Sequence, residues 1–143
     1  MIKTLFYPRF LKKDEEGEIR EKAMNLLNIV GLSGVIERSG NNLSWVDCQL
    51  LQIARSLATE PELLILDEPT AGMGFEESRM VGKIIKQIRD TGITIILISH
   101  DMKLVMENAD HVTVLDFGEK ISEGHPLRVK DDPRVLEAYL GTE

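Results

Sequence analysis

Two short apolar runs constrain the fold of this chain more than any other feature. Leu63–Leu66 and Ile93–Ile98 are each the length of a strand, and a segment with helical periodicity separates them. Such unbroken apolar runs are typical of strands that are buried on both faces of a sheet. A strand, a helix and a second strand in this order form a βαβ unit with parallel strands and a right-handed crossover. We therefore expect an α/β protein with a parallel sheet and flanking helices.

Further elements are expected on both sides of this unit. Asp14 is suited to cap a helix that Gly31 ends, and Ser44 is suited to cap a second helix that ends before Pro61. In chain order, the remaining expectations are a loop at 33–42, helices at about 76–90, 102–108 and 132–140, and a strand at 112–115 that turns at 117–120.

Composition narrows the class of protein. With 143 residues, 43% hydrophobic and 29% charged, the chain fits one compact globular domain or a large piece of one. No apolar run approaches the roughly 20 residues of a membrane helix. The single cysteine, Cys48, allows no internal disulfide and favours a reducing, cytoplasmic setting. The net charge of −7 argues against a nucleic-acid partner, because phosphate backbones select basic surfaces.

Polar residues follow both apolar runs. Asp67 and Glu68 end the first, and Ser99, His100 and Asp101 end the second. Because parallel strands share one carboxyl edge, these side chains are expected to converge at the edge where open α/β sheets bind ligands.

Adjacent acids after a strand point in opposite directions, so they are expected to do different work. One could face a hydrated Mg²⁺ and the other could act as a general base on a water. His100 could contact a transferring phosphoryl oxygen or hold the carboxylate and its water in place. The alternatives are a solvated turn at Asp67–Glu68 and an ordinary surface histidine at a strand end.

These residues carry a family resemblance. Leu63–Thr70 resembles the Walker B segment of ABC ATPases, and Ile98–Asp101 resembles their switch histidine. Ala71–Gly74 stands at the place of the D-loop, and Leu43–Asp47 stands at the place of the signature that precedes a helix. The order and spacing match over nearly the whole chain. The aromatic Trp45, the Ala71–Met73 run and the segment Asp132–Gly141 look most like ATPase subunits of branched-chain amino-acid importers.

The resemblance implies roles for four residues. Asp67 would hold Mg²⁺ through water, and Glu68 would polarise the attacking water. His100 would contact the γ-phosphate, and Ser44 would meet the γ-phosphate of a nucleotide held by a second ATPase subunit. ATP and Mg²⁺ would bind only in an assembled, complete site.

The resemblance also implies an architecture and a setting. The fold would be part of a P-loop NTPase, with residues 1–58 as the helical subdomain and signature helix and 59–143 as the C-terminal part of the RecA-like core. The partners would be transmembrane permease subunits and a second ATPase subunit, identical or different. The chain would lie in the cytoplasm, peripheral on the inner face of the cell membrane.

Three features depart from the family pattern. No G-x-x-x-x-G-K-[ST] loop, which would cradle the phosphates, occurs in the chain. Val46 stands where the signature has glycine, and forcing it to a positive φ would cost about 1–3 kcal/mol. Gly74 stands where Asp or Asn is frequent. A plain helix N-cap is therefore an open alternative for Ser44.

Several functions stay open on these grounds. The chain could be part of a transport ATPase, a truncated fragment that binds no nucleotide, or a regulatory module that docks on another ATPase. A receiver-like or other flavodoxin-like binding domain would need an early acidic cluster after a first strand and a lysine after a late strand, and neither is evident in this sequence. We expect the chain alone to be inactive. We also expect its strands to leave apolar faces and edges open, so that it is marginally stable, aggregated or completed by a partner.

Overall fold

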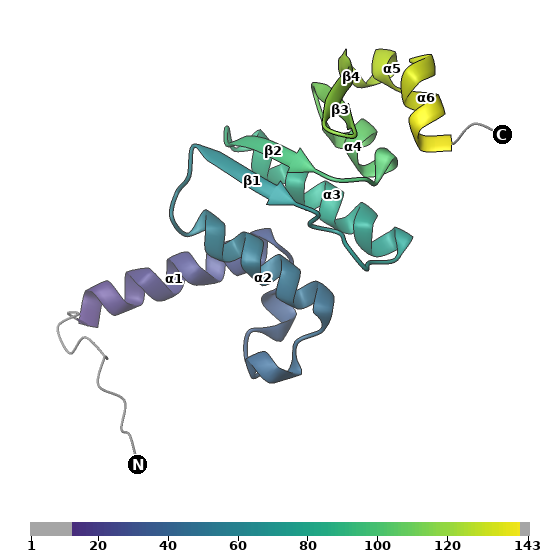
Figure 1. Ribbon diagram of the computed structural model, residues 1–143. Helices are drawn as coiled ribbons and strands as arrows, with labels where there is room; N and C mark the ends of the chain where they lie inside the picture. The colour runs from purple at the N-terminus through teal and green to yellow at the C-terminus, as the bar shows by residue number, and fades with distance from the viewer. Residues whose placement is uncertain (1–12, 141–143) are drawn as a thin grey trace. The chain divides into compact units, whose positions relative to one another are not determined.

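The computed structural model describes residues 13–140 and divides the chain into two compact units (Figure 1). The division falls between Pro61 and Glu62.

The first unit contains two helices joined by short turns. They are α1 (Lys13–Ile29) and α2 (Trp45–Leu57), with single turns of 3₁₀ helix at Ser33–Val35 and Gly40–Asn42 between them. The segment expected to be a loop therefore contains two local turns. The buried side chains of α2 recur at helical spacing and are Leu50, Ile53, Ala54 and Leu57.

Helix α1 differs from the expectation in two respects. Asp14 lies inside the helix rather than at its cap, because the helix already includes Lys13. Its apolar stripe is covered only toward its C-terminal end: Val30 is fully buried, whereas Ile19 is 55% exposed. Gly31 ends the helix as expected, with a φ of 78° in the left-handed region that glycine adopts without strain.

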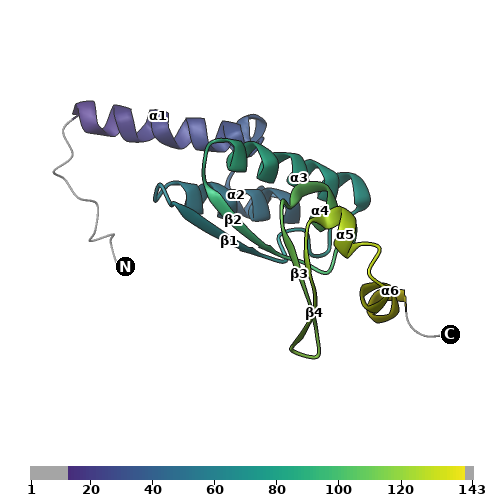
Figure 2. The same cartoon turned by 90° about the horizontal axis from the view of Figure 1, so that it is seen from above.

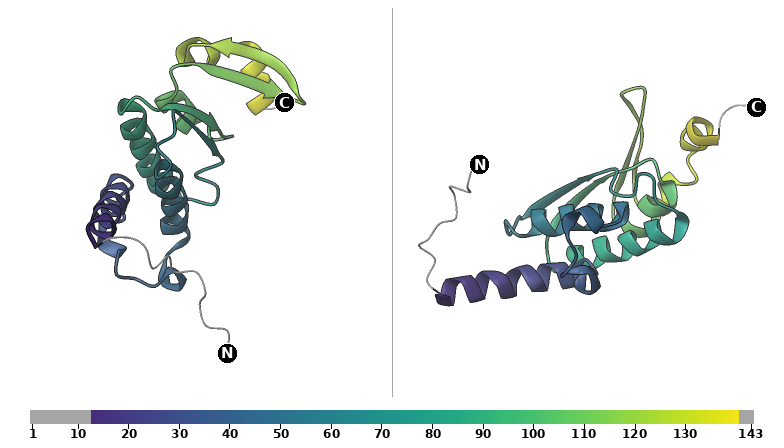
Figure 3. Two further views of the ribbon diagram at one scale, coloured as in Figure 1. Left: turned by 90° about the vertical axis from the view of Figure 1, so that its left-hand side faces the viewer. Right: turned by 90° about the horizontal axis from the view of Figure 1, so that it is seen from below.

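The second unit begins with the expected βαβ arrangement. β1 (Leu63–Asp67) pairs in parallel with β2 (Thr94–Ile98), and α3 (Phe75–Asp90) connects them. Figure 3 shows α3 running along one side of the two-stranded sheet. The helix buries one apolar stripe, which consists of Val81, Ile84, Ile85 and Ile88. The parallel βαβ expectation is confirmed.

The other face of this sheet is uncovered. Burial alternates along β1, so that Leu64 and Leu66 are buried while Ile65 is 58% exposed. Its neighbour on β2, Ile96, is 45% exposed, and Leu63 and Ile98 are also exposed. Within residues 13–140 neither strand pairs with a further strand, so the sheet has two open edges. The expected open apolar face and open edges are confirmed.

An antiparallel hairpin follows a short helix. After α4 (Met102–Asn108), β3 (Val112–Asp116) pairs with β4 (Glu119–Gly124). Phe117 and Gly118 connect the strands with φ values of 45° and 84°, the pair of positive angles that a type I′ turn requires. Figure 2 shows the two strands running side by side to this turn.

The hairpin has its own small core. α5 (Pro126–Val129), which was not expected from the sequence, and α6 (Pro133–Leu140) pack beside it. The buried residues of this cluster are Val112, Val114, Val129 and Val135. In the part of the chain that the structure describes, no helix is long and apolar enough to cross a membrane.

The uncovered sheet face predicts self-association. We expect the isolated chain to bind a hydrophobic dye and to form oligomers or aggregates, because Ile65 and Ile96 are neighbours on an apolar face in water. The double variant Ile65→Thr/Ile96→Thr keeps β-branched residues and should lower dye binding by about half. Dye fluorescence and size-exclusion chromatography with light scattering measure both effects.

A matched control replaces two exposed leucines outside this sheet. Leu115→Thr/Leu127→Thr removes side chains that are 64% and 63% exposed, and it should change association much less. A dilute wild-type monomer that binds no dye and melts in one sharp transition would contradict the prediction.

Candidate functional site

The strand register places the candidate residues at one edge of the sheet. Asp67, the last residue of β1, lies opposite Ile98, the last residue of β2. The next residues along each strand are Glu68 and Ser99, followed by His100. The expected convergence of polar groups at the carboxyl edge is therefore present.

Glu68 and His100 are in direct contact. One carboxylate oxygen of Glu68, Oε1, accepts a hydrogen bond from the backbone N–H of His100 at 3.1 Å and lies 2.8 Å from its ring Nδ1. The hydroxyl of Ser99 donates to the other oxygen, Oε2, at a longer 3.5 Å. The backbone N–H of Glu68 in turn donates to the carbonyl of Ile98 at 2.9 Å. The loops after the two strands are thus held together through Glu68.

The backbone of Glu68 is strained. Its φ is 46°, in the left-handed region that residues with a side chain adopt at a cost of about 1–3 kcal/mol. Its contacts with Ile98 and His100 hold this conformation in place. Conformations of this kind cluster at functional sites, where the surrounding structure imposes them.

The contact with Glu68 raises the pKa of His100. The hydrogen bond to the Glu68 carboxylate, together with its negative charge, raises the pKa of His100 above its ordinary value of 6.5. The side chain of His100 is 80% exposed, so the imidazolium form is also well solvated. An ionised carboxylate only accepts hydrogen bonds, so Nδ1 carries the proton and Nε2 is left for another ligand.

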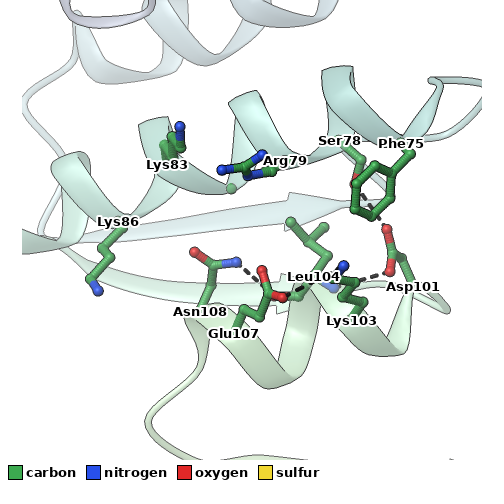
Figure 4. A pocket seen from close by; sticks show the side chains of 11 residues that line it. Phe75, Ser78, Arg79, Lys83, Lys86, Asp101, Lys103, Leu104, Glu107 and Asn108 are labelled. Carbon is green, nitrogen blue, oxygen red and sulfur yellow. Dashed lines mark hydrogen bonds and ion pairs between the residues drawn. The ribbon is translucent and has the colours of Figure 1, made fainter.

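Asp101 anchors the segment that follows. Its carboxylate accepts hydrogen bonds from the backbone N–H of Leu104 at 3.0 Å, which caps α4, and from the hydroxyl of Ser78 at 2.8 Å (Figure 4). Burial alone would raise the pKa of the Asp101 carboxyl, but the hydrogen bonds from Leu104 and Ser78 outweigh it and hold the pKa below its usual range. The bond between Asp101 and Ser78 ties the loop that carries His100 to α3.

Asp67 contributes an exposed carboxylate at the same edge. Within residues 13–140, no group of three or more His, Cys, Asp or Glu side chains is arranged to hold a metal ion. At the end of β1 the described residues therefore provide the single carboxylate of Asp67 for a metal ion, and not a cluster of ligands.

The connection from Glu68 to α3 is a chain of turns. The N–H of Ala71 donates to the carbonyl of Glu68 at 3.1 Å, and the N–H of Met73 donates to the carbonyl of Thr70 at 3.1 Å. Gly72 has a φ of 75°, which glycine adopts without strain at this turn. Gly74 then caps α3, and its N–H donates to the carboxylate of Glu77 at 2.8 Å.

Ser44 belongs to the first unit, and its contacts there are those of a helix cap. Its hydroxyl accepts from the N–H of Asp47 at 3.1 Å, and its own N–H donates to the Asp47 carboxylate at 3.0 Å. This reciprocal pair is a capping box for α2. The role of Ser44 toward a nucleotide stays a prediction.

Val46 is not strained. It lies in the first turn of α2 and is not among the described residues with a positive φ. The cost of about 1–3 kcal/mol for a positive φ therefore does not arise at Val46, because the capping box starts a regular helix at this position. The remaining physical difference from glycine is the size of the side chain at the helix N-terminus.

Sequence reasoning missed two features of the site. One is the positive φ of Glu68: the following Pro69 disfavours the right-handed helical region but does not select the left-handed one. The other is the bond from Ser78 to Asp101, which spans 23 residues. No local pattern could have indicated that bond, because it depends on how α3 and α4 pack.

Comparison with known proteins identifies the family. A profile of the ABC transporter family matches residues 3–71, and a profile described as branched-chain amino acid ATP-binding cassette transporter matches residues 119–143. The high-affinity branched-chain amino acid transport ATP-binding protein LivG of Escherichia coli K12 is 36% identical over 145 residues, which cover 98% of this chain and 57% of that protein. The chain belongs to the ABC transporter ATP-binding family.

A second relative and a solved structure support the same family assignment. The high-affinity branched-chain amino acid transport ATP-binding protein BraF of Pseudomonas aeruginosa is 39% identical over 127 residues. The match covers 88% of this chain and 50% of BraF. A crystal structure of an ATP-binding cassette of an ABC transporter in its ADP conformation superposes with a TM-score of 0.78 at 32% identity, over 96% of this chain and 55% of that one. The predicted family and fold are confirmed.

The chain spans about half the length of the relatives it matches, corresponding to their C-terminal half. The solved cassette is covered to the same extent.

The Glu68–His100 contact predicts a measurable pKa. We expect NMR titration to give His100 a pKa above 6.5, and Glu68→Gln to lower it, because the substitution removes the charge that favours the imidazolium. Since the pKa is raised on folding, the contact stabilises the fold fully below about pH 6.5 and loses this effect as the pH rises through the raised pKa.

The control substitution is Glu123→Gln, which removes a carboxylate that contacts His111 and Lys120 instead. It should leave the titration of His100 unchanged. A His100 pKa that is equal in the wild type and in Glu68→Gln would show that the contact does not persist in solution.

The capping box of Ser44 predicts a loss of stability on truncation. Ser44→Ala should lower the free energy of unfolding by about 1 kcal/mol, because the N–H of Asp47 loses its acceptor. Ser44→Asn should restore most of this loss, since asparagine caps helices well. Urea unfolding followed by circular dichroism measures the difference, and equal stability of Ser44→Ala and the wild type would contradict the cap.

Proposed function

We propose that this chain supplies the acid and histidine side of the ATP site in an ABC ATPase that powers branched-chain amino-acid import. The observation that carries the proposal is the Glu68–His100 contact at the carboxyl edge of the parallel sheet. The family of the chain and the names of its relatives supply the substrate class.

The residues at this edge are chemically suited to a magnesium nucleotide. Mg²⁺ prefers oxygen ligands and in nucleotide sites takes one or two carboxylates, with waters and phosphates completing its shell. Asp67 offers one exposed carboxylate in the right place, and we propose that it holds Mg²⁺ through water. The bound magnesium nucleotide would supply the phosphoryl group and neutralise its charge.

Glu68 is proposed as the group that orients and polarises the attacking water. Its Oε1 is engaged by His100, whereas the one hydrogen bond to Oε2 from the described residues is the 3.5 Å contact with Ser99. A water that replaces or joins that weak contact would meet a carboxylate that is already fixed in direction. The strained backbone of Glu68 supports this role, because it aims the side chain across the edge toward the second strand.

His100 is proposed to contact the γ-phosphate through Nε2. Because Nδ1 is committed to Glu68, Nε2 is the nitrogen that a ligand can reach. The raised pKa of His100 favours the imidazolium, in which Nε2–H donates to a phosphoryl oxygen. The Asp101–Ser78 bond would keep the loop that carries His100 in position.

Ser44 is proposed to meet a γ-phosphate held by a second ATPase subunit. The start of α2 supports this, since helix N-termini present free N–H groups to anions. The first unit would then be the helical subdomain with the signature helix, and the second would be part of the RecA-like core. We further propose permease subunits as partners and the inner face of the cell membrane as the location.

A second candidate is a chain with no catalytic role, and two observations favour it. The sequence contains no G-x-x-x-x-G-K-[ST], and Val46 places a branched side chain in the first turn of the signature helix, where glycine would let a phosphate approach closely. Such a chain would bind no nucleotide by itself, or would dock on another ATPase as a regulatory module.

Calorimetry and a chimera separate the two candidates. The chain alone should show no binding of magnesium ATP at millimolar concentration, because its own residues include no phosphate-cradling loop. A chimera that joins the chain to the part of E. coli LivG that it does not cover should hydrolyse ATP. In that chimera Glu68→Gln should lower the rate by about 10²–10⁴-fold.

The control in the chimera is again Glu123→Gln, which lies on β4 and should leave hydrolysis unchanged. A folded chimera that binds ATP without hydrolysing it would favour the second candidate. A chain that hydrolyses ATP alone would show that another surface provides the phosphate cradle.

A further inference from the structure

We propose that the groove between α3 and α4 binds an acidic peptide segment of a partner protein. The groove lies wholly within the second unit and has a volume of about 240 Å³ (Figure 4). Asp67, Glu68 and His100 do not line the groove, so it is separate from the proposed ATP site.

A close approach of the two helices shapes the groove. At Gly82 a Cβ atom would lie 2.9 Å from Nδ2 of Asn108 and 3.0 Å from Cδ1 of Leu104, which are closer than ordinary contacts. The absence of a side chain at this position brings α4 against α3. Leu104 is buried at this junction, and the exposed ring of Phe75 stands at one end of the groove.

Cationic side chains line the α3 side. Arg79, Lys83 and Lys86 are spaced i, i+4 and i+7, so they follow one face of the helix over about 10 Å. Lys103 approaches from α4, and its ammonium lies 4.1 Å from the centre of the Phe75 ring. Within residues 13–140, Lys83 and Lys86 make no ion pair with a carboxylate.

The two carboxylates of the groove are already engaged. Asp101 accepts from Ser78 and from the N–H of Leu104, and Glu107 lies 4.0 Å from the ammonium of Lys103. With four cationic and two anionic side chains, the lining is net basic in a chain whose net charge is −7. Arg79 lies 3.6 Å from the carboxylate of Glu76, so within residues 13–140 the uncompensated charge of this strip lies at Lys83 and Lys86.

The charges and shape favour a peptide over an extended anionic surface. Carboxylates spaced i, i+4 and i+7 on a helical segment would match the row on α3, and one apolar residue could lie against Phe75. An anionic membrane or a nucleic acid would meet the acidic remainder of the chain as well as the groove, and its repulsion opposes binding. Complementary charge over a short length is what an acidic segment offers.

The test measures binding of a synthetic probe to the full chain. The probe is a fluorescein-labelled helical peptide with glutamates at i, i+4 and i+7 and one leucine beside them, and anisotropy reports its binding. We expect saturable binding that weakens with salt. Lys83→Glu/Lys86→Glu should weaken it about tenfold or more, since two contacts turn from attractive to repulsive.

A matched variant separates a specific groove from general charge. Arg128→Glu/Lys130→Glu makes the same change in net charge on exposed residues of α5 and its cap, outside the groove, and should alter the affinity by about twofold or less. A peptide with glutamine in place of glutamate should not bind. Circular dichroism of both variants shows whether they fold like the wild type.

Three results would overturn the proposal. They are no binding of the acidic peptide by the folded wild type, an equal loss of affinity in both double variants, and binding to phosphatidylserine-containing vesicles without binding to the peptide. The last result would assign the basic row to a lipid surface.

Discussion

Parallel pairing of β1 with β2 is the interaction on which the rest of the second unit depends. The register joins Asp67 to Ile98, and it therefore brings the residues that follow each strand to one edge. A slip of one residue would turn Leu64 and Leu66 to the open face and would separate Glu68 from His100. The packing of α3 against one face of the sheet and the geometry of the candidate site thus depend on the same set of backbone hydrogen bonds.

The contact between Glu68 and His100 links the two strand ends chemically. It joins residues that are 32 positions apart, and a strained backbone at Glu68 is part of its geometry. A local distortion with no neighbour to impose it would relax, so the strain is sustained by the pairing on both sides. The same contact selects the ring nitrogen that is left for a ligand and raises the pKa of the imidazole. Backbone topology, side-chain contact and protonation therefore form one chain of causes.

The second unit exposes two surfaces that differ in how well they tolerate water. The apolar face that carries Ile65 and Ile96 is uncovered, which is unfavourable in water and calls for another layer. The groove between α3 and α4 is charged and tolerates water, so its exposure costs little and leaves it free for a partner.

The sequence by itself determined the elements and the candidate residues. Apolar runs before Asp67 and Ser99 predicted the strands, and helical periodicity between them predicted the parallel connection, because these patterns reflect local backbone preferences and burial. The motif around Glu68 and His100 also sufficed to name the family. The helix at Pro126–Val129 escaped prediction because a four-residue helix has too few positions to show a period.

Only the tertiary structure decided features that depend on distant neighbours. The exposure of Ile65 and the bond from Ser78 to Asp101 both follow from which surfaces meet. The left-handed backbone of Glu68 belongs to this group, since residues some thirty positions along the chain hold it. The basic groove does as well: Arg79, Lys83 and Lys86 look like an ordinary solvated helix face until α4 packs beside them at Gly82. Local sequence encodes periodicity and capping, whereas contacts between elements are decided by packing.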